Sequence, residues 1–157
     1  MKRKSLCRNQ SGVSLTELSV MVMIIGIVAV LAAPALISYS QAARLKAGAQ
    51  ELAAVVNQAR QVAISRNTTT CIVQSADKVR FRVGTCGAGT VWTGPGTDAS
   101  GWFALTDDVR VSAATANVVF THLGTASTAG TYTVLNPSTN RTMRVIVALS
   151  GRITIGP

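Results

Sequence analysis

The chain has 157 residues, room for one modest domain, and its 15 Lys and Arg residues against six Asp and Glu give a formal net charge of +9 at pH 7. His122 is its single histidine, and the sequence has no nucleophile motif, no phosphate-binding loop and no closely spaced Cys and His residues. The adjacent acids Asp107 and Asp108 open an expected strand, where neighbouring side chains point to opposite faces. We therefore expect no enzyme activity, no cofactor and no metal site.

The first feature along the chain is a basic start followed by a long apolar segment. Lys2, Arg3, Lys4 and Arg8 precede residues 18–37, none of which carries a formal charge. At 1.5 Å per residue, a helix of this length spans about 30 Å, the thickness of a bilayer core. The positive-inside rule places the basic start in the cytoplasm. We therefore expect a single-pass membrane protein whose remaining chain is exported.

Three interpretations of this segment compete. A secretory signal cleaved near Ala32 and Ala33 has an apolar run of only about 7 to 15 residues. A plain membrane anchor explains the length but not Glu17, because an unpaired acid costs on the order of 2.5 to 3.5 kcal/mol at the bilayer centre and somewhat less at the edge. No basic residue lies within a helical turn or two after Glu17. We therefore expect its partner to belong to another molecule.

The third interpretation comes from the motif around Glu17. The stretch SGVSLTE, residues 11–17, resembles the processing site of type IV prepilins and type II secretion pseudopilins, in which a basic leader ends in Gly and Glu is fifth in the mature chain. The resemblance implies that a prepilin peptidase cuts between Gly12 and Val13 and methylates the new amine of Val13, which stands where Phe is usual. It also implies that Glu17 pairs with the N-terminal amine of a neighbouring subunit and that Pro34 locally loosens the helix.

Beyond Pro34 the apolar residues form a stripe with helical spacing. This pattern predicts one helix from about residue 14 to about residue 66, whose first half crosses the membrane and whose second half packs on a sheet. An amphipathic helix lying on the membrane surface is the alternative, and the small residues of the stripe fit it less well because they suit close packing. The stripe consists of Leu45, Ala49, Leu52, Val56, Ala59 and Ala63.

After the helix, apolar residues recur at every second position, in short runs separated by turn residues. Residues 84–101 are so rich in turn residues that we expect a surface loop with Trp92 folded back. The fold class is α+β and pilin-like, a long N-terminal helix packed on an antiparallel sheet. We expect a cleaved leader at 1–12, a membrane helix at 13–37, an amphipathic helix at 38–66 and a β head at 67–157. Strands are expected at 69–74, 79–83, 102–105, 109–112, 117–121, 131–136, 144–149 and 152–155.

The C-terminal half narrows the resemblance. The segments ARQVAISRNTTTCIV, GWFAL, DDVRV, VVFTHLG and SGRITI resemble, in that order, segments of the GspH/FimT family of minor pseudopilins and minor pilins, and the likeness covers nearly the whole chain. It implies a protein of the bacterial inner membrane with a cytoplasmic N-terminus and a periplasmic head, which joins other pilin or pseudopilin subunits in a type II secretion pseudopilus or a type IV pilus. A major pilin is the competing assignment.

The three cysteines separate by compartment. Cys7 lies in the leader on the reducing side, whereas Cys71 and Cys86 face an oxidising periplasm, where a disulfide between them would close a hairpin. The alternative is that Cys71 is a buried small residue and Cys86 a free thiol in a loop.

An alternative function rests on the C-terminal charges. Residues 109–157 contain Arg110, Arg141, Arg144 and Arg152 and no acid, a balance that suits phosphate contacts. Some FimT-type minor pilins bind DNA for natural transformation through a Gly-Arg-x-Arg-x-Gly motif, and residues 151–156 match it except that Thr154 replaces the second arginine. The resemblance thus implies DNA binding through Arg141, Arg144 and Arg152. The alternative, without DNA binding, is that Arg152 only starts the last strand and Arg144 only faces solvent.

Overall fold

The computed structural model describes residues 12–106 and 109–157 and divides into two compact units, Met1–Tyr39 and Ser40–Pro157. The boundary follows the expected end of the membrane segment by two residues. Residues 1–11 of the expected leader, with Cys7, and the acid pair Asp107 and Asp108 lie outside the described residues. Every buried apolar side chain that the structure describes belongs to the second unit, from Leu45 to Val147, so this unit has a core of its own.

The first unit is the N-terminal part of helix α1 (Leu15–Ser65). Each of its residues from Gly12 to Tyr39 is exposed, among them Val30 at 73% and Leu31 at 75%. Within the described residues, α1 is the one helix long and apolar enough to cross a membrane, and the most apolar part of it is wholly uncovered. A core helix of a soluble protein would be buried, so this stretch requires a covering from outside the chain.

The rest of α1 forms the first layer of the second unit. The helix predicted for residues 14–66 is confirmed, and every residue of the predicted stripe is at most 5% exposed. The small residues allow close approach: a Cβ added to Gly48 would lie 2.9 Å from Cγ1 of Val109. The helix ends in a left-handed residue, Asn67, with φ of 49°. The amides of Asn67 and Thr68 then donate to the carbonyl oxygens of Ile64 and Ala63, which satisfies two terminal carbonyls.

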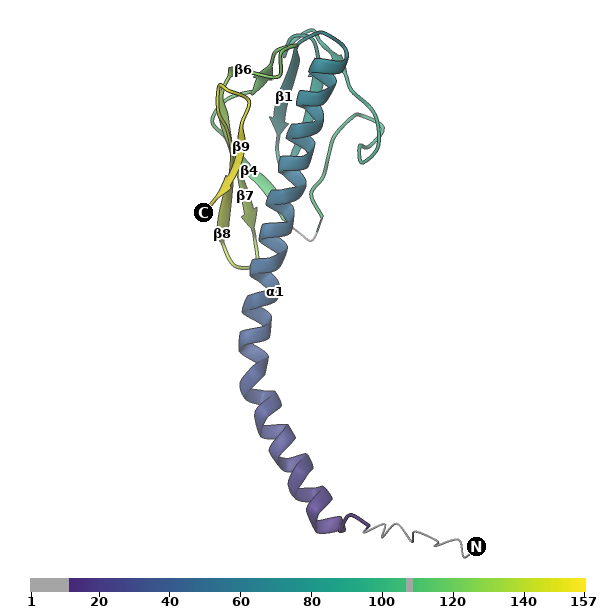
Figure 1. The fold of residues 1–157 in the computed structure, drawn as a ribbon, viewed down its shortest axis with the longest axis vertical. Coiled ribbons are helices and arrows are strands. Elements are labelled where there is room, and N and C mark those ends of the chain that lie inside the picture. Colours follow the sequence, from purple (N-terminus) through teal and green to yellow (C-terminus); the bar gives the residue numbers. More distant parts are fainter. Residues whose placement is uncertain (1–11, 107–108) are drawn as a thin grey trace, which may run out of the picture. The chain divides into compact units, whose positions relative to one another are not determined.

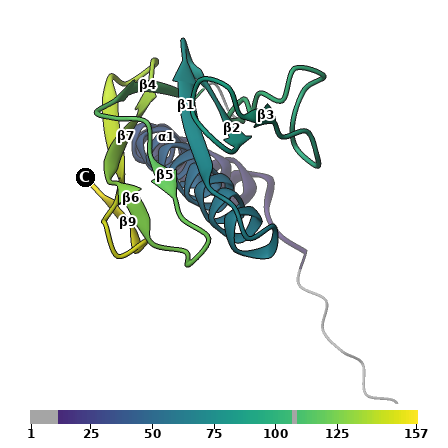
Figure 2. The ribbon, with the colours of Figure 1, turned by 90° about the horizontal axis from the view of Figure 1, so that it is seen from above.

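Two antiparallel sheets pack with this helix, as Figure 2 shows from above. The five-stranded sheet has the order β3-β2-β1-β5-β6. The four-stranded sheet, whose strands are all labelled in Figure 1, has the order β4-β7-β8-β9. Their inner faces and the helix share one apolar core. The strands are β1 (Thr70–Ser75), β2 (Lys78–Val83), β3 (Thr90–Val91), β4 (Arg110–Ala114), β5 (Val119–Phe120), β6 (Ala126–Thr128), β7 (Gly130–Asn136), β8 (Arg141–Val147) and β9 (Ile153–Gly156).

The α+β fold class is confirmed, and three details differ from the prediction. The head has two sheets where one was expected. Residues 102–105 form no strand, because only one isolated bridge, between Val79 and Phe103, pairs them with β2. Strands β3 and β6 were not predicted, and β3 falls inside the expected loop at 84–101. Both are two or three residues long, too short for an alternating pattern to be visible.

Candidate assembly and interaction surfaces

The expected processing site lies at the start of the described chain. Gly12 and Val13 precede α1 and are exposed, with Val13 at 67%, and a Cβ added to Gly12 would meet nothing within 4 Å. The hydroxyls of Ser14 and Thr16 lie 2.8 Å apart just after them. Among the described residues, nothing covers the junction between Gly12 and Val13.

Glu17 lies in the first turn of α1, where a carboxylate interacts favourably with the helix dipole. It is exposed, and the next basic residue along the chain is Arg44. The one ion pair among the described residues joins Lys78 and Asp98, so Glu17 has no cationic partner there. Pro34 lies inside α1 and has no amide hydrogen, so it cannot donate to the carbonyl of Val30. That missing bond is the physical basis for a looser helix at this point.

Cys71 and Cys86 are joined by a disulfide, with their Cα atoms 5.0 Å apart. Cys71 is buried on β1 and is paired across the ladder with Arg82. Cys86 belongs to the segment that follows β2, so the bridge fastens this segment to the outer side of the β1–β2 hairpin.

Three cations on β2 hold the same segment further along. Lys78, Arg80 and Arg82 alternate with buried residues and therefore share the outer face of the sheet. Nη1 of Arg82 donates to the carbonyl oxygens of Gly87 and Gly89, at 2.8 and 3.3 Å. The remaining contacts are the guanidinium of Arg80, 4.2 Å from the ring centroid of Trp102, and the pair of Lys78 Nζ with Asp98 Oδ2 at 3.8 Å.

The expected surface loop is thus fixed in place by its own contacts. Trp92 folds back as predicted, and its ring stacks on Phe81 with centroids 4.6 Å apart. The amide of Trp102 donates to Asp98 and is the largest of the contributions that lower the pKa of that carboxyl. These contacts of the β2 cations were not predicted. Their signal in the sequence is the strict alternation of cations, at Lys78, Arg80 and Arg82, with apolar residues.

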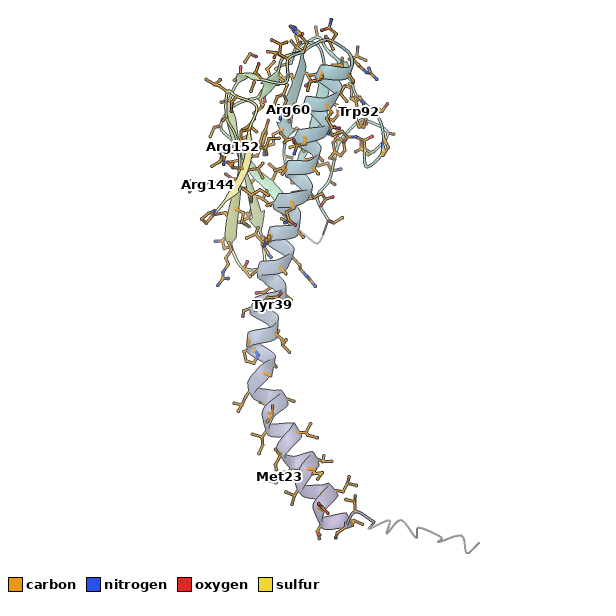
Figure 3. All side chains as sticks on the ribbon, viewed as in Figure 1. Met23, Tyr39, Arg60, Trp92, Arg144 and Arg152 are labelled. Atoms are coloured by element: carbon orange, nitrogen blue, oxygen red, sulfur yellow. A yellow bond between two sulfur atoms is a disulfide. The ribbon has the colours of Figure 1, made fainter. Side chains whose placement is uncertain are left out.

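The arginines proposed for DNA binding do not all share a face. Register pairs Arg144 with Gly156 and Ile146 with Thr154, and the amide of Ala148 donates to the carbonyl of Arg152. Alternation therefore places Arg144, Thr154 and Arg152 on the outer side of the four-stranded sheet, where Figure 3 shows both arginines. Arg141, at the start of β8, is exposed but belongs by alternation to the other face. The structure brings Arg144 and Arg152 onto one surface and leaves Arg141 off it.

The end of the head where α1 finishes carries a feature that was not predicted. The turn between β5 and β6 and the turn between β8 and β9 meet there, at Gly124 and Gly151, and Nε of Arg60 lies beside both. Patterning could not find this place because the three segments are far apart in the sequence.

Comparison with known proteins finds one family profile and several solved structures that are similar to this chain. The profile of the family described as type II transport protein GspH matches residues 48–151. The crystal structure of the type IV minor pilin FimU of Pseudomonas aeruginosa is 22% identical, with a TM-score of 0.53, and the match covers 76% of this chain and 92% of that one.

Two further solved structures share the fold. The minor pseudopilin EpsH from the type 2 secretion system of Vibrio cholerae is 12% identical, with a TM-score of 0.54, over 71% of this chain and 95% of that one. The solution structure of Escherichia coli GspH is 17% identical, with a TM-score of 0.54, over 72% of this chain and 87% of that one. None of the curated proteins compared with the sequence matches it.

Proposed function

This chain belongs to the GspH family of type II transport proteins, and from that membership we propose that it is a minor subunit of a type IV pilin-like filament, either a type II secretion pseudopilus or a type IV pilus. The role is structural and not enzymatic. The protein is anchored in the bacterial inner membrane with its N-terminus in the cytoplasm and its head in the periplasm. Other pilin or pseudopilin subunits are its partners.

The observation that carries this proposal is the uncovered apolar stretch of α1. Residues 12–39 are all exposed, and the large apolar side chains from Val13 to Ile37 are at least half exposed. Within a membrane, lipid covers such a surface. After extraction from the membrane, only the apolar helices of other subunits cover it equally well. The same stretch thus serves first as an anchor and then as an assembly element.

Processing by a prepilin peptidase connects the two states. Cleavage between Gly12 and Val13 creates a new amine, methylated on Val13, four residues before the unpaired carboxylate of Glu17. An amine of one subunit and a carboxylate of the next then neutralise each other in an apolar surrounding, where each alone is costly. Pro34 allows the helix to adjust where helices pack side by side.

The test compares the full chain in cells with and without a prepilin peptidase. Mass spectrometry is expected to find a methylated Val13 terminus with the peptidase, and an intact precursor both without it and when Gly12 carries a bulkier side chain. Ser11→Ala is the matched control and is expected to be processed normally. Cleavage near Ala33 would instead make the chain a secreted soluble protein and overturn the proposal.

Binding of DNA is the second candidate function, and the observation that favours it is the placement of Arg144 and Arg152. Both are exposed on one face of the four-stranded sheet. Residues 109–157 contain no acid that would lower the positive electrostatic potential around them. Ile146 and Thr154 lie between them on that face, so the two charges are roughly 13 Å apart by strand rise. Two charges alone make a weak, non-specific site.

A band-shift titration of Ser40–Pro157 with duplex DNA at low salt tests this second candidate. Arg144→Gln and Arg152→Gln are each expected to weaken binding and to lower the salt slope by about one unit, and Thr154→Arg to strengthen it. Arg141→Gln is the matched control and is expected to change binding less, because Arg141 belongs to the other face. No binding, or binding indifferent to these changes, would remove DNA as a ligand.

A further inference from the structure

One end of the head, where α1 finishes, gathers large apolar side chains at its surface. Ile64 in the last turn of α1, Leu123 between β5 and β6, and Leu149 between β8 and β9 are 48%, 74% and 61% exposed. Contacts between these segments hold them side by side. A Cβ added to Gly124 would lie 2.8 Å from Cδ1 of Ile64, and the amide of Ala126 donates to the carbonyl of Leu149 at 2.9 Å. Three distant parts of the sequence thus form one apolar patch.

An arginine lies beneath this patch with part of its side chain unpartnered. Nε of Arg60 is buried and has no hydrogen-bond partner. It is 3.1 Å from the Cβ position of Gly124 and 3.4 Å from that of Gly151, so it lies against both turns. The terminal nitrogens of Arg60 are not among the buried atoms and make no hydrogen bond to the described residues, so they remain free for a partner. Figure 3 labels Arg60 on α1 and Arg152 beside the neighbouring strand.

The two turns are built so that they close over Arg60. Gly124 and Gly151 are buried and have φ of 79° and 80°, a region that side chains strain to adopt. A Cβ on Gly151 would also collide with the carbonyl oxygen of Gly124. Any larger residue at either position would separate the turns and uncover Nε of Arg60.

The charges around the patch are of one sign. Arg152 adjoins the turn between β8 and β9, and Arg66 follows the last turn of α1, both exposed. The described acids of the head lie elsewhere. Glu51 accepts hydrogen bonds from the amide and hydroxyl of Thr106, and Asp98 is paired with Lys78. No carboxylate of the described chain therefore reaches Arg60.

We infer that this end of the head is a docking surface for a segment of a different subunit that presents a carboxylate beside apolar side chains. The inference rests on the proposed function, because the partner is a filament neighbour. An arginine fork pairs with a carboxylate through two parallel hydrogen bonds, and an apolar centre with a polar rim is the usual composition of a protein interface. Leu123, the most exposed of the three apolar side chains, provides an anchor for the partner's apolar residues.

Two other occupants fit less well. A nucleic acid presents phosphates, which favour the face on which Arg144 and Arg152 are both exposed over an apolar patch. A second copy of the head offers Glu51 and Asp98, which are already bonded, and Asp77, which lies in the two-residue turn between β1 and β2 beside Lys78.

The first test uses hexanoate, a carboxylate on a short apolar tail, as the probe. In ¹H–¹⁵N spectra of Ser40–Pro157, which has its own core, hexanoate is expected to shift the amides of Leu123, Gly124 and Gly151 and the Nε–H of Arg60 in a saturable way. Hexanamide, which lacks the charge, and inorganic phosphate, which lacks the tail, are expected to bind at least about fivefold more weakly, the loss of one of two contributions.

Variants distinguish binding of hexanoate at the apolar patch from attraction by the overall positive charge of the head. Arg60→Gln and Leu123→Ser are each expected to weaken hexanoate binding about fivefold or more, and Arg141→Gln, which removes the same charge at the other end of β8, to leave it unchanged. Leu123→Ser alters an exposed side chain, so it keeps the test informative if Arg60→Gln fails to fold. Equal binding of phosphate, or shifts confined to Arg144 and Thr154, would overturn the inference.

The second test places a photo-crosslinking residue at position 123 of the full chain in cells that make its filament. The expected adduct joins position 123 to a different filament subunit, at or beside an Asp or Glu of that subunit, and it disappears with Arg60→Gln. The same residue at Ser138, in the turn between β7 and β8, is the control. An adduct between two copies of this chain, or one unaffected by Arg60→Gln, contradicts the inference. Normal processing at Gly12 in these cells would show that the proposed function stands even if the docking surface does not.

Discussion

Tyr132 on β7 donates its hydroxyl hydrogen to the carbonyl oxygen of Ile72 on β1, 3.4 Å away and 60 residues earlier in the chain. The same hydroxyl accepts the amide hydrogen of Val118 at 3.3 Å. Tyr132 belongs to the four-stranded sheet and Ile72 to the five-stranded sheet, and no strand pair connects the two sheets among the described residues. One buried hydroxyl therefore links the two layers across the core.

Replacing Tyr132 with Phe is expected to destabilise the head by about 1 to 3 kcal/mol. The ring and its packing remain, but the amide of Val118 is left buried without its partner, and such a loss has this magnitude. Urea unfolding of Ser40–Pro157 measures the change. Ser112→Ala removes an exposed hydrogen bond to the carbonyl of Thr133 and is the matched control, with an expected change below about 0.5 kcal/mol. A Tyr132→Phe variant as stable as the control would show that the hydrogen bonds of this hydroxyl contribute nothing to stability.

The same residue predicts a loss of stability at high pH. Burial raises the pKa of the Tyr132 hydroxyl above its ordinary value of about 10. The unfolded chain then releases this proton at a lower pH than the folded chain, so the stabilisation is complete below pH 10 and falls as the pH rises further. Unfolding midpoints between pH 8 and pH 11.5 measure it. Tyr132→Phe is expected to flatten the decline, and an equal decline in both proteins would assign it to other groups.

The long helix was predictable because the apolar pattern that specifies it repeats along the chain. The stripe from Leu45 to Ala63 recurs every three or four residues, and Asn67 is one of the residues that adopt a left-handed helix end readily. The motif from Ser11 to Glu17 is a local sequence of seven residues, so it can be recognised without knowledge of the fold. Its role stays a prediction, since the chain alone contains neither the peptidase nor the neighbouring amine.

The head was predicted less well because its organisation depends on contacts between distant segments. The division into two sheets follows from which strands pair, as when β1 takes β5 as its neighbour, and no local pattern encodes that choice. The ties of Arg80 to Trp102 and of Arg60 to the turns at Gly124 and Gly151 join residues at least 20 positions apart. Their sequence signals are single residues, which carry little information before the fold is known.

Reduction of the disulfide is expected to destabilise the head by about 3 kcal/mol. Cys71 and Cys86 enclose a loop of 15 residues, and opening such a loop restores conformational freedom to the unfolded chain. Unfolding with and without dithiothreitol measures the difference. The double variant Cys71→Ala and Cys86→Ala is expected to be insensitive to the reductant. If reduction leaves the midpoint unchanged, the three cation contacts of β2 hold the segment by themselves.

Glu17→Val is expected to leave membrane insertion intact and to impair assembly. The substitution removes the one charged side chain of residues 13–43, so the anchor becomes more compatible with lipid. It also removes the carboxylate that pairs with the amine of the next subunit, and co-purification with other filament subunits is expected to fall on the order of tenfold. Glu17→Gln keeps the shape without the charge and is expected to assemble as poorly, whereas Ser19→Val, two residues further along the helix, is expected to assemble normally. Membrane fractionation followed by quantification of the filament fraction separates insertion from assembly. Normal assembly of both Glu17 variants would mean that the apolar surface of α1 suffices for subunit contact and that the acid has another role.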